Sequence, residues 1–168
     1  MASLSSLIGG NGWEHFGEAT WRCAANTLGQ TVANISGPET VTIDTEVLDT
    51  GNKLTVNGDN TFTLEAGTYS YKIFVPMGSD TDSGLGAFNL RLWNVTDSDL
   101  LGSLQHTLDS NYGMRDESFE GVFVLPSQKT LRIDVLSETT GVIGRENSHF
   151  LTMTDLVDRT RFQFKWRA

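Results

Sequence analysis

The chain has 168 residues, a length that suits one domain with its own hydrophobic core. Twelve basic and 21 acidic side chains give a net charge of −9, and an acidic chain repels phosphate backbones, which argues against nucleic-acid binding. No run approaches the roughly 20 apolar residues of a membrane-spanning helix, so we expect no membrane contact. The single cysteine, Cys23, excludes an intrachain disulfide, and its simplest role is that of a small buried apolar residue.

The N-terminal 12 residues form an arm of apolar residues and glycines. Its apolar side chains are Leu4, Leu7 and Ile8. The arm cannot build a core by itself, so it is either a disordered terminus or a docking segment. It lacks the basic start and the long apolar run of a secretory signal, and we therefore expect synthesis in the cytoplasm. Trp13, Phe16 and Trp21 follow, a density of aromatic residues that predicts an ordered segment. We treat residues 1–26 as an N-terminal arm and aromatic docking segment.

The clearest strand patterns lie within residues 41–76. Side chains alternate over residues 68–75, where one face consists of Tyr69, Tyr71, Ile73 and Val75, and a similar alternation covers residues 41–48. A period of two in β-branched and aromatic residues is typical of half-buried strands. The link between them contains Gly51-Asn52 and Asn57-Gly58, which tolerate the positive φ of tight turns. The sequence therefore predicts an all-β, antiparallel protein.

Further strands are expected towards the C-terminus. Residues 87–94 place Phe88, Leu90 and Leu92 on one face, and residues 100–108 continue the pattern. Residues 119–125 and 130–136 are interpreted as a hairpin-like pair joined through residues 126–129. Together these segments extend a single β domain over residues 27–157.

Residues 158–168 alternate aromatic with polar side chains and carry four basic groups against one acid. The aromatic side chains are Phe162, Phe164 and Trp166. One interpretation is a further core strand. The other is an extra strand that pairs with a neighbouring subunit or partner, with Arg167 and the three aromatic residues as docking groups.

No pattern in the sequence indicates catalysis. The three histidines are scattered, and there is no nucleophile elbow, phosphate loop or dinucleotide fingerprint, so we expect neither an enzyme nor a cofactor. The only weak metal candidate is the loop at 80–84, where Asp80 and Asp82 precede a glycine in a pattern that resembles a calcium loop. The loop lacks a third acid and a distal glutamate, and a plain solvated loop is the favoured interpretation.

Several short motifs resemble the complement globular-head and tumour-necrosis-factor superfamily. An Asp-Thr-Gly turn at 49–51 precedes a Phe-centred strand and then Glu-Ala-Gly-Thr-Tyr at 65–69, and in that family Ala-Gly-x-Tyr introduces a central strand of the inner sheet. Residues 90–93, 121–136 and 141–156 fit in order, the last resembling the closing stretch of the family. The resemblance implies an antiparallel jelly-roll sandwich that assembles as a homotrimer through its inner sheets. It also implies that Tyr69 and Tyr71 stack at the trimer interface and that both chain ends emerge at one base.

The opening of the chain also resembles a class of proteins. Residues 5–12 read Ser-x-Leu-Ile-Gly-Gly-x-Gly and are similar to short docking segments of tailed-phage head decorations and fibres. We therefore expect a non-enzymatic virion protein on the phage capsid surface, most simply a trimeric decoration (cement) protein that binds the major capsid protein and stabilises the head. Its expected docking groups are Leu4, Leu7, Ile8, Trp13, Phe162, Phe164, Trp166 and Arg167. The alternative is the receptor- or glycan-binding tip of a tail fibre, with Trp93 and Tyr112 as the available aromatic platforms. A bacterial signalling or adhesion module is disfavoured by the missing export signal.

Overall fold

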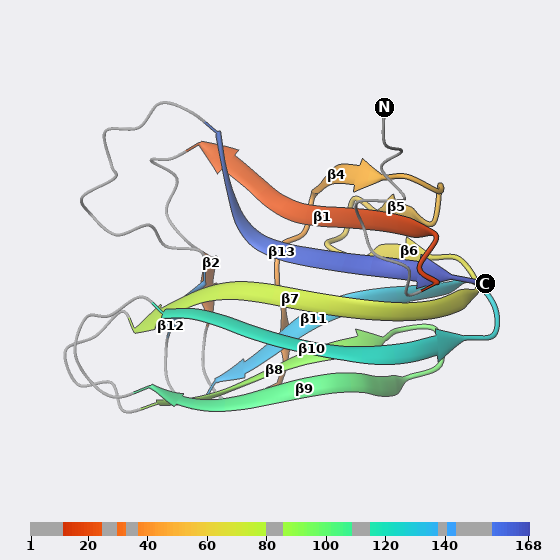
Figure 1. Ribbon diagram of the computed structural model, residues 1–168. Coiled ribbons are helices and arrows are strands. Elements are labelled where there is room, and N and C mark those ends of the chain that lie inside the picture. The colour runs from red at the N-terminus through yellow and green to blue at the C-terminus, as the bar shows by residue number, and fades with distance from the viewer. Residues whose placement is uncertain are drawn as a thin grey trace.

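The computed structural model describes residues 12–24, 30–32, 37–79, 86–108, 115–137, 141–143 and 156–168. These residues form thirteen strands in two antiparallel sheets, which lie face to face as a sandwich (Figure 1). Within the described part of the chain, no helix is long and apolar enough to cross a membrane. The all-β, antiparallel prediction is confirmed.

Sheet A contains the long strands of the molecule. Its order is β4 (Thr45–Asp49), β1 (His15–Ala24), β13 (Leu156–Arg167), β7 (Gly67–Ser79) and β10 (Arg115–Leu125). β7 is longer than the segment that pairs with β13, and its end pairs with the short strand β12 (Gly141–Ile143). β2 (Gln30–Val32) pairs with the other side of β12.

Sheet B forms the second layer. Its order is β5 (Leu54–Val56), β6 (Phe62–Leu64), β11 (Lys129–Ser137), β8 (Gly86–Asn94) and β9 (Asp99–Leu108), and β3 (Glu39–Thr40) pairs with the end of β11. Phe88, Leu90 and Leu92 point inward from β8, as their alternation predicts.

The core between the sheets is rich in aromatic rings. Phe162 from β13 lies 4.5 Å from Phe62 in sheet B, measured between ring centroids, and 6.4 Å from Tyr71 on β7. Tyr69 packs on Phe123 at 5.2 Å and on Phe164 at 5.5 Å. Rings of this size bury a large apolar area for each residue and prefer such offset and tilted pairs, so they supply much of the hydrophobic stabilisation of the sandwich.

The Ala-Gly motif before β7 has a specific physical role. Gly67 has φ +152°, and a Cβ built on it would lie 2.0 Å from Nε1 of Trp166. That indole N–H donates a hydrogen bond to the carbonyl of Ala66 at 3.1 Å. Only glycine combines this backbone conformation with room for the Trp166 ring, which fixes the start of β7 against the end of β13.

The structure corrects the interpretation of residues 158–168 as an extra strand. β13 lies between β1 and β7, and every position from Arg161 to Trp166 pairs on both sides. The last strand of the sandwich is therefore β13, which begins where the stretch at 141–156 ends. The boundaries at residues 26 and 158 do not separate structural units either, because β1 and β13 are both inside sheet A.

The expected hairpin of residues 119–136 is also wrong. β10 pairs with β7 in sheet A, whereas β11 pairs with β3, β6 and β8 in sheet B. The connection through Pro126 thus crosses from one layer to the other, a connection typical of Greek-key sandwiches. Alternation alone cannot distinguish the two arrangements, because a strand has the same period in a hairpin and in a crossover.

Candidate functional site

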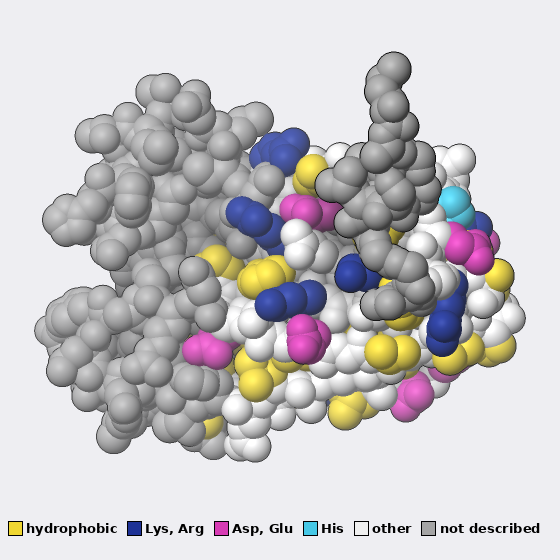
Figure 2. Space-filling view, in the orientation of Figure 1, with side chains coloured by type: hydrophobic (Ala, Val, Ile, Leu, Met, Phe, Trp, Pro, Cys, Tyr) yellow, Lys and Arg dark blue, Asp and Glu magenta, His cyan; other side chains and the backbone are white. Residues whose placement is uncertain are grey.

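The outward face of sheet A carries a row of polar side chains across its strands. In register order the row contains Glu18, Gln163, Lys72 and Glu120, and Leu48 lies beside Glu18 at the β4 end. Gln163 donates a hydrogen bond from Nε2 to Oε2 of Glu18 at 2.8 Å, and Lys72 places its Nζ 4.8 Å from the centroid of the Phe74 ring. Acidic and basic groups therefore alternate on one face, and Figure 2 shows them interleaved with hydrophobic side chains.

Apolar residues flank this row on both sides. On β10, Val122 and Val124 are 65% and 66% exposed, and at the other edge Leu48 is 48% exposed. In the described residues β10 pairs with β7 alone, so its second edge has no strand partner. An unpaired edge beside exposed valines is a surface that soluble proteins normally cover.

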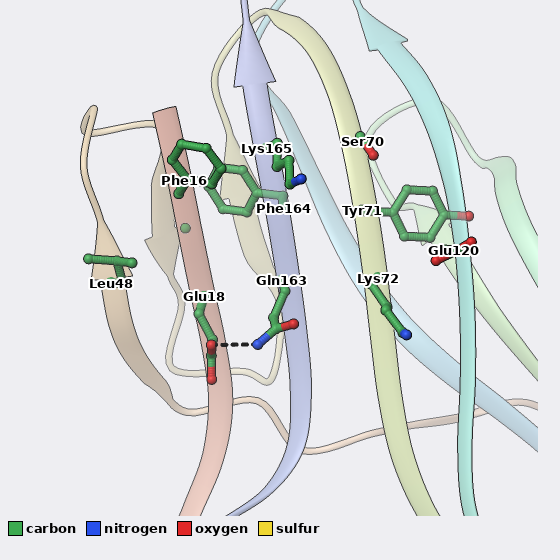
Figure 3. Close-up of a pocket in the computed structure, with 11 residues that line it drawn as sticks. Phe16, Glu18, Leu48, Ser70, Tyr71, Lys72, Glu120, Gln163, Phe164 and Lys165 are labelled. Carbon is green, nitrogen blue, oxygen red and sulfur yellow. Dashed lines mark hydrogen bonds between the residues drawn. The ribbon is translucent and has the colours of Figure 1, made fainter. Parts of the chain in front are cut away.

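A depression of about 400 Å³ lies between the flanks, over β1, β13 and β7 (Figure 3). Phe16 and Leu48 line one side, while Lys72 and Glu120 lie on the other. The floor near β1 is a glycine: a Cβ on Gly17 would lie 2.1 Å from Cζ of Phe164, so the missing side chain lets that ring pack against the β1 backbone. The depression mixes apolar and charged lining, which suits a protein surface better than a small catalytic centre.

The structure corrects the expected trimer residues on β7. Tyr69 and Tyr71 are 0% and 4% exposed and point into the core of a single chain, so they cannot stack around an axis between chains. Burial raises the pKa of both phenols, and the negative charges of Glu65 and Asp49 raise that of Tyr69 further. The Tyr69 hydroxyl donates a hydrogen bond to the carbonyl of Glu65 at 2.7 Å. The outward residues of β7 are those of the opposite parity, such as Ser70 and Lys72.

The two ends of the described chain meet, as the resemblance implies. Glu14 N–H donates a hydrogen bond to the carbonyl of Trp166 at 2.8 Å, and the Arg167 guanidinium lies 5.2 Å from the Trp13 ring centroid. Trp13 is half-buried and Arg167 is exposed, so both remain accessible for docking.

The aromatic residues of β13 are not accessible. The expectation that Phe162, Phe164 and Trp166 dock a partner is wrong, because they are 0%, 3% and 7% exposed and belong to the core. The alternation of residues 161–167 therefore places the aromatic side chains inside and the basic side chains outside.

Other candidates lie elsewhere. Leu4, Leu7, Ile8, Asp80, Asp82 and Tyr112 lie outside the described residues, as does the side chain of Cys23. In the described part of the chain, no three His, Cys, Asp or Glu side chains are grouped so that they could hold a metal ion.

Sequence reasoning missed Val122 and Val124, although a signal was present. Residues 121–125 read Gly-Val-Phe-Val-Leu, with apolar residues on both faces of a strand. A strand that faces water on one side normally alternates with polar residues, so apolar residues at both parities indicate that both faces are covered. Phe123 faces the core, and Val122 and Val124 face out.

Comparison with known proteins identifies the fold. No family model matches the sequence, and no curated protein sequence matches it. Among solved structures, murine APRIL at pH 8.5 superposes with a TM-score of 0.57 at 12% identity, over 92% of this chain and 100% of that one. The chain has a TNF-like jelly-roll fold. The PRD1 vertex protein P5 shares the jelly roll, with a TM-score of 0.53 at 11% identity over 94% of this chain and 100% of that one.

Proposed function

We propose that this chain is a non-enzymatic structural protein of a virion that assembles as a homotrimer and decorates the capsid. Two observations support the proposal. The TNF-like jelly roll is shared with a viral vertex protein, and proteins with the TNF-like fold typically trimerise. Fold alone does not determine function, so the surface features of this chain carry the rest of the proposal.

The exposed face of sheet A is the observation that carries the assembly. Val122 and Val124 expose most of their side chains on β10, whose second edge has no strand partner among the described residues, and the depression beside β1 offers a concave surface of mixed apolar and charged lining. In a closed ring, the β10 edge of one subunit would pack on the sheet A face of the next. Full burial of a valine side chain contributes roughly 1.5–3 kcal/mol, so two valines from each of three subunits provide substantial driving force.

Charge on the same face is compatible with this contact. Glu18 and Glu120 carry negative charge, while Lys72, Arg161 and Lys165 carry positive charge. Glu120 beside the β10 edge of one subunit can therefore meet the basic residues on the face of the next, whereas a face of a single sign would repel its copy.

Attachment to the capsid is assigned to the end of the sandwich where the chain termini meet. Trp13 and Arg167 are accessible there, and the arm with Leu4, Leu7 and Ile8 precedes them in the sequence. Three such ends on one trimer act together, so weak individual contacts give strong overall attachment. The basic Arg167 would meet acidic groups of the shell, which makes attachment sensitive to salt.

The experiment is co-sedimentation of the protein with stripped capsids of the virus that encodes it. Full-length protein should pellet with capsids, and removal of residues 2–11 should abolish pelleting while the oligomeric mass is unchanged. Arg167→Gln should weaken pelleting while the oligomeric mass is unchanged. Normal pelleting of both the truncated protein and Arg167→Gln would refute docking through the termini. Failure of the full-length protein to pellet would refute the capsid role.

A further inference from the structure

The outward face of sheet B contains a buried charge cluster that the proposed function does not use. Asp134 on β11 has a fully buried side chain. Its Oδ2 accepts hydrogen bonds from Nε and Nη2 of Arg91 at 3.0 and 2.9 Å. Arg132 places Nε 2.8 Å from Oδ1 of the same carboxylate. One carboxylate therefore fixes two arginines from neighbouring strands.

Beside the cluster lies a partly exposed apolar surface. Trp93 on β8 is the cross-strand partner of Arg132 on one side and of Leu100 on the other. The Arg91 guanidinium lies 4.3 Å from the Trp93 ring centroid, which fixes the indole orientation. Leu100 is 49% exposed and extends the apolar surface of the Trp93 ring on the next strand.

Arg132 is only partly covered. Its Nε is buried against the Asp134 carboxylate, whereas 30% of its side chain is exposed, so the rest of the guanidinium can reach a ligand. Two cations against one anion leave the cluster with a net charge of +1 on a chain of net charge −9. A planar guanidinium that is held in place and left partly exposed is suited to bind a carboxylate through two parallel N–H donors.

We propose that Arg132, Trp93 and Leu100 form a binding platform for an acidic saccharide. The sugar carboxylate binds Arg132, and the apolar face of the sugar ring packs on Trp93 and Leu100. Neighbouring strands lie about 5 Å apart, so the three side chains form a flat surface that one or two sugar rings can cover. An extended peptide fits less well, because β8 and β11 are interior strands whose backbone groups are already paired.

This inference goes beyond the proposed function and does not depend on it. The platform is on sheet B, whereas the proposed assembly uses the outward face of sheet A. A trimer would leave the platform open and display three copies, so a weak single site would gain avidity on a surface rich in acidic glycans.

The test is an NMR titration of the full-length protein with D-glucuronate and N-acetylneuraminate, observed at the indole N–H signals. The Trp93 signal is assigned by its loss in Trp93→Phe. Both acidic sugars should shift it saturably, and Arg132→Gln should weaken binding at least tenfold. Arg161→Gln, which removes an arginine from the outward face of sheet A, should leave the affinity unchanged. If Arg132→Gln fails to fold, Arg132→Lys keeps the charge, loses the bidentate geometry and should also weaken binding.

Three results would overturn the proposal. The first is the absence of a saturable Trp93 shift with either acidic sugar. The second is an equal response to neutral methyl glucoside, which would show that Arg132 takes no part. The third is an equal response to acetate, which would indicate an adventitious ion only. Because every titration is observed at the Trp93 indole signal, these results are independent of trimer assembly and of capsid binding.

Discussion

Replacement of Phe162 by alanine tests whether the C-terminal strand is part of the core. Phe162 is 0% exposed, and its ring contacts Phe62, Phe164 and Tyr71 at centroid distances of 4.5, 5.8 and 6.4 Å. Truncation of a buried phenylalanine costs about 3–5 kcal/mol, and each aromatic pair contributes about 0.5–1.5 kcal/mol beyond area burial. With three such pairs, we expect a loss in the upper part of that range, about 4–5 kcal/mol. For a domain of this size the loss corresponds to a Tm decrease of about 8–20 °C.

The assay is urea unfolding followed by circular dichroism, at a fixed protomer concentration because assembly contributes to apparent stability. Arg167→Ala is the matched control, since Arg167 lies on the same strand, is exposed and outside the proposed assembly contact, and should change stability by no more than about 1 kcal/mol. A loss below about 1 kcal/mol for Phe162→Ala, or one equal to that of the control, would refute the placement of β13 in the core.

Three further substitutions test local packing and charge. Gly17→Ala should destabilise the fold by about 1–3 kcal/mol in urea unfolding, because its Cβ would meet the Phe164 ring at 2.1 Å; a neutral effect would contradict that contact. Burial raises the pKa of Tyr69, so above about pH 10 only the unfolded chain ionises readily; stability present below that pH should be lost as pH rises towards the folded pKa. Tyr69→Phe should flatten this alkaline loss in melting curves, and an unchanged pH profile would count against it. Asp134→Asn should cost about 3–5 kcal/mol, because it leaves Arg91 and a second arginine without their buried counter-charge; a variant as stable as the parent would contradict this reasoning.

Sequence periodicity predicted the strands well, because local patterns determine them. Tyr69, Tyr71 and Ile73 share one face of β7 as their alternation indicates, and all three are buried. The pattern does not reveal which face meets the core and which meets another chain, since both can be apolar. The family resemblance predicts a homotrimer with Tyr69 and Tyr71 at its interface. In the structure these two side chains instead fill the space between the two sheets of one chain.

Residues 158–168 show the same ambiguity for a whole strand. Phe162 and Phe164 alternate with basic residues, and this pattern fits a core strand and an exposed docking strand equally well. The difference lies in pairing with β1 and β7, which are about 145 and 90 residues away in the sequence, and single-sequence reasoning has no access to such pairing.

The candidate sites could be predicted only in part. Glu18, Gln163, Lys72 and Glu120 come from four different strands, and only the register of sheet A brings them into one row. The sequence offers Trp93 as a candidate aromatic platform, with Arg91 two residues earlier on the same face of the strand. Arg132 comes beside Trp93 only through the pairing of β8 with β11, which the sequence does not reveal.

The mass of the protein in solution tests the central claim most directly. Light scattering coupled to size-exclusion chromatography should give three times the 18.5 kDa chain mass at micromolar concentration. Val122→Lys with Val124→Lys should dissociate the trimer into folded monomers, whereas Leu100→Lys, at an exposed leucine of sheet B, should leave it intact. A monomeric parent protein, or a double-lysine variant that keeps the trimer mass, would contradict assembly through the outward face of sheet A.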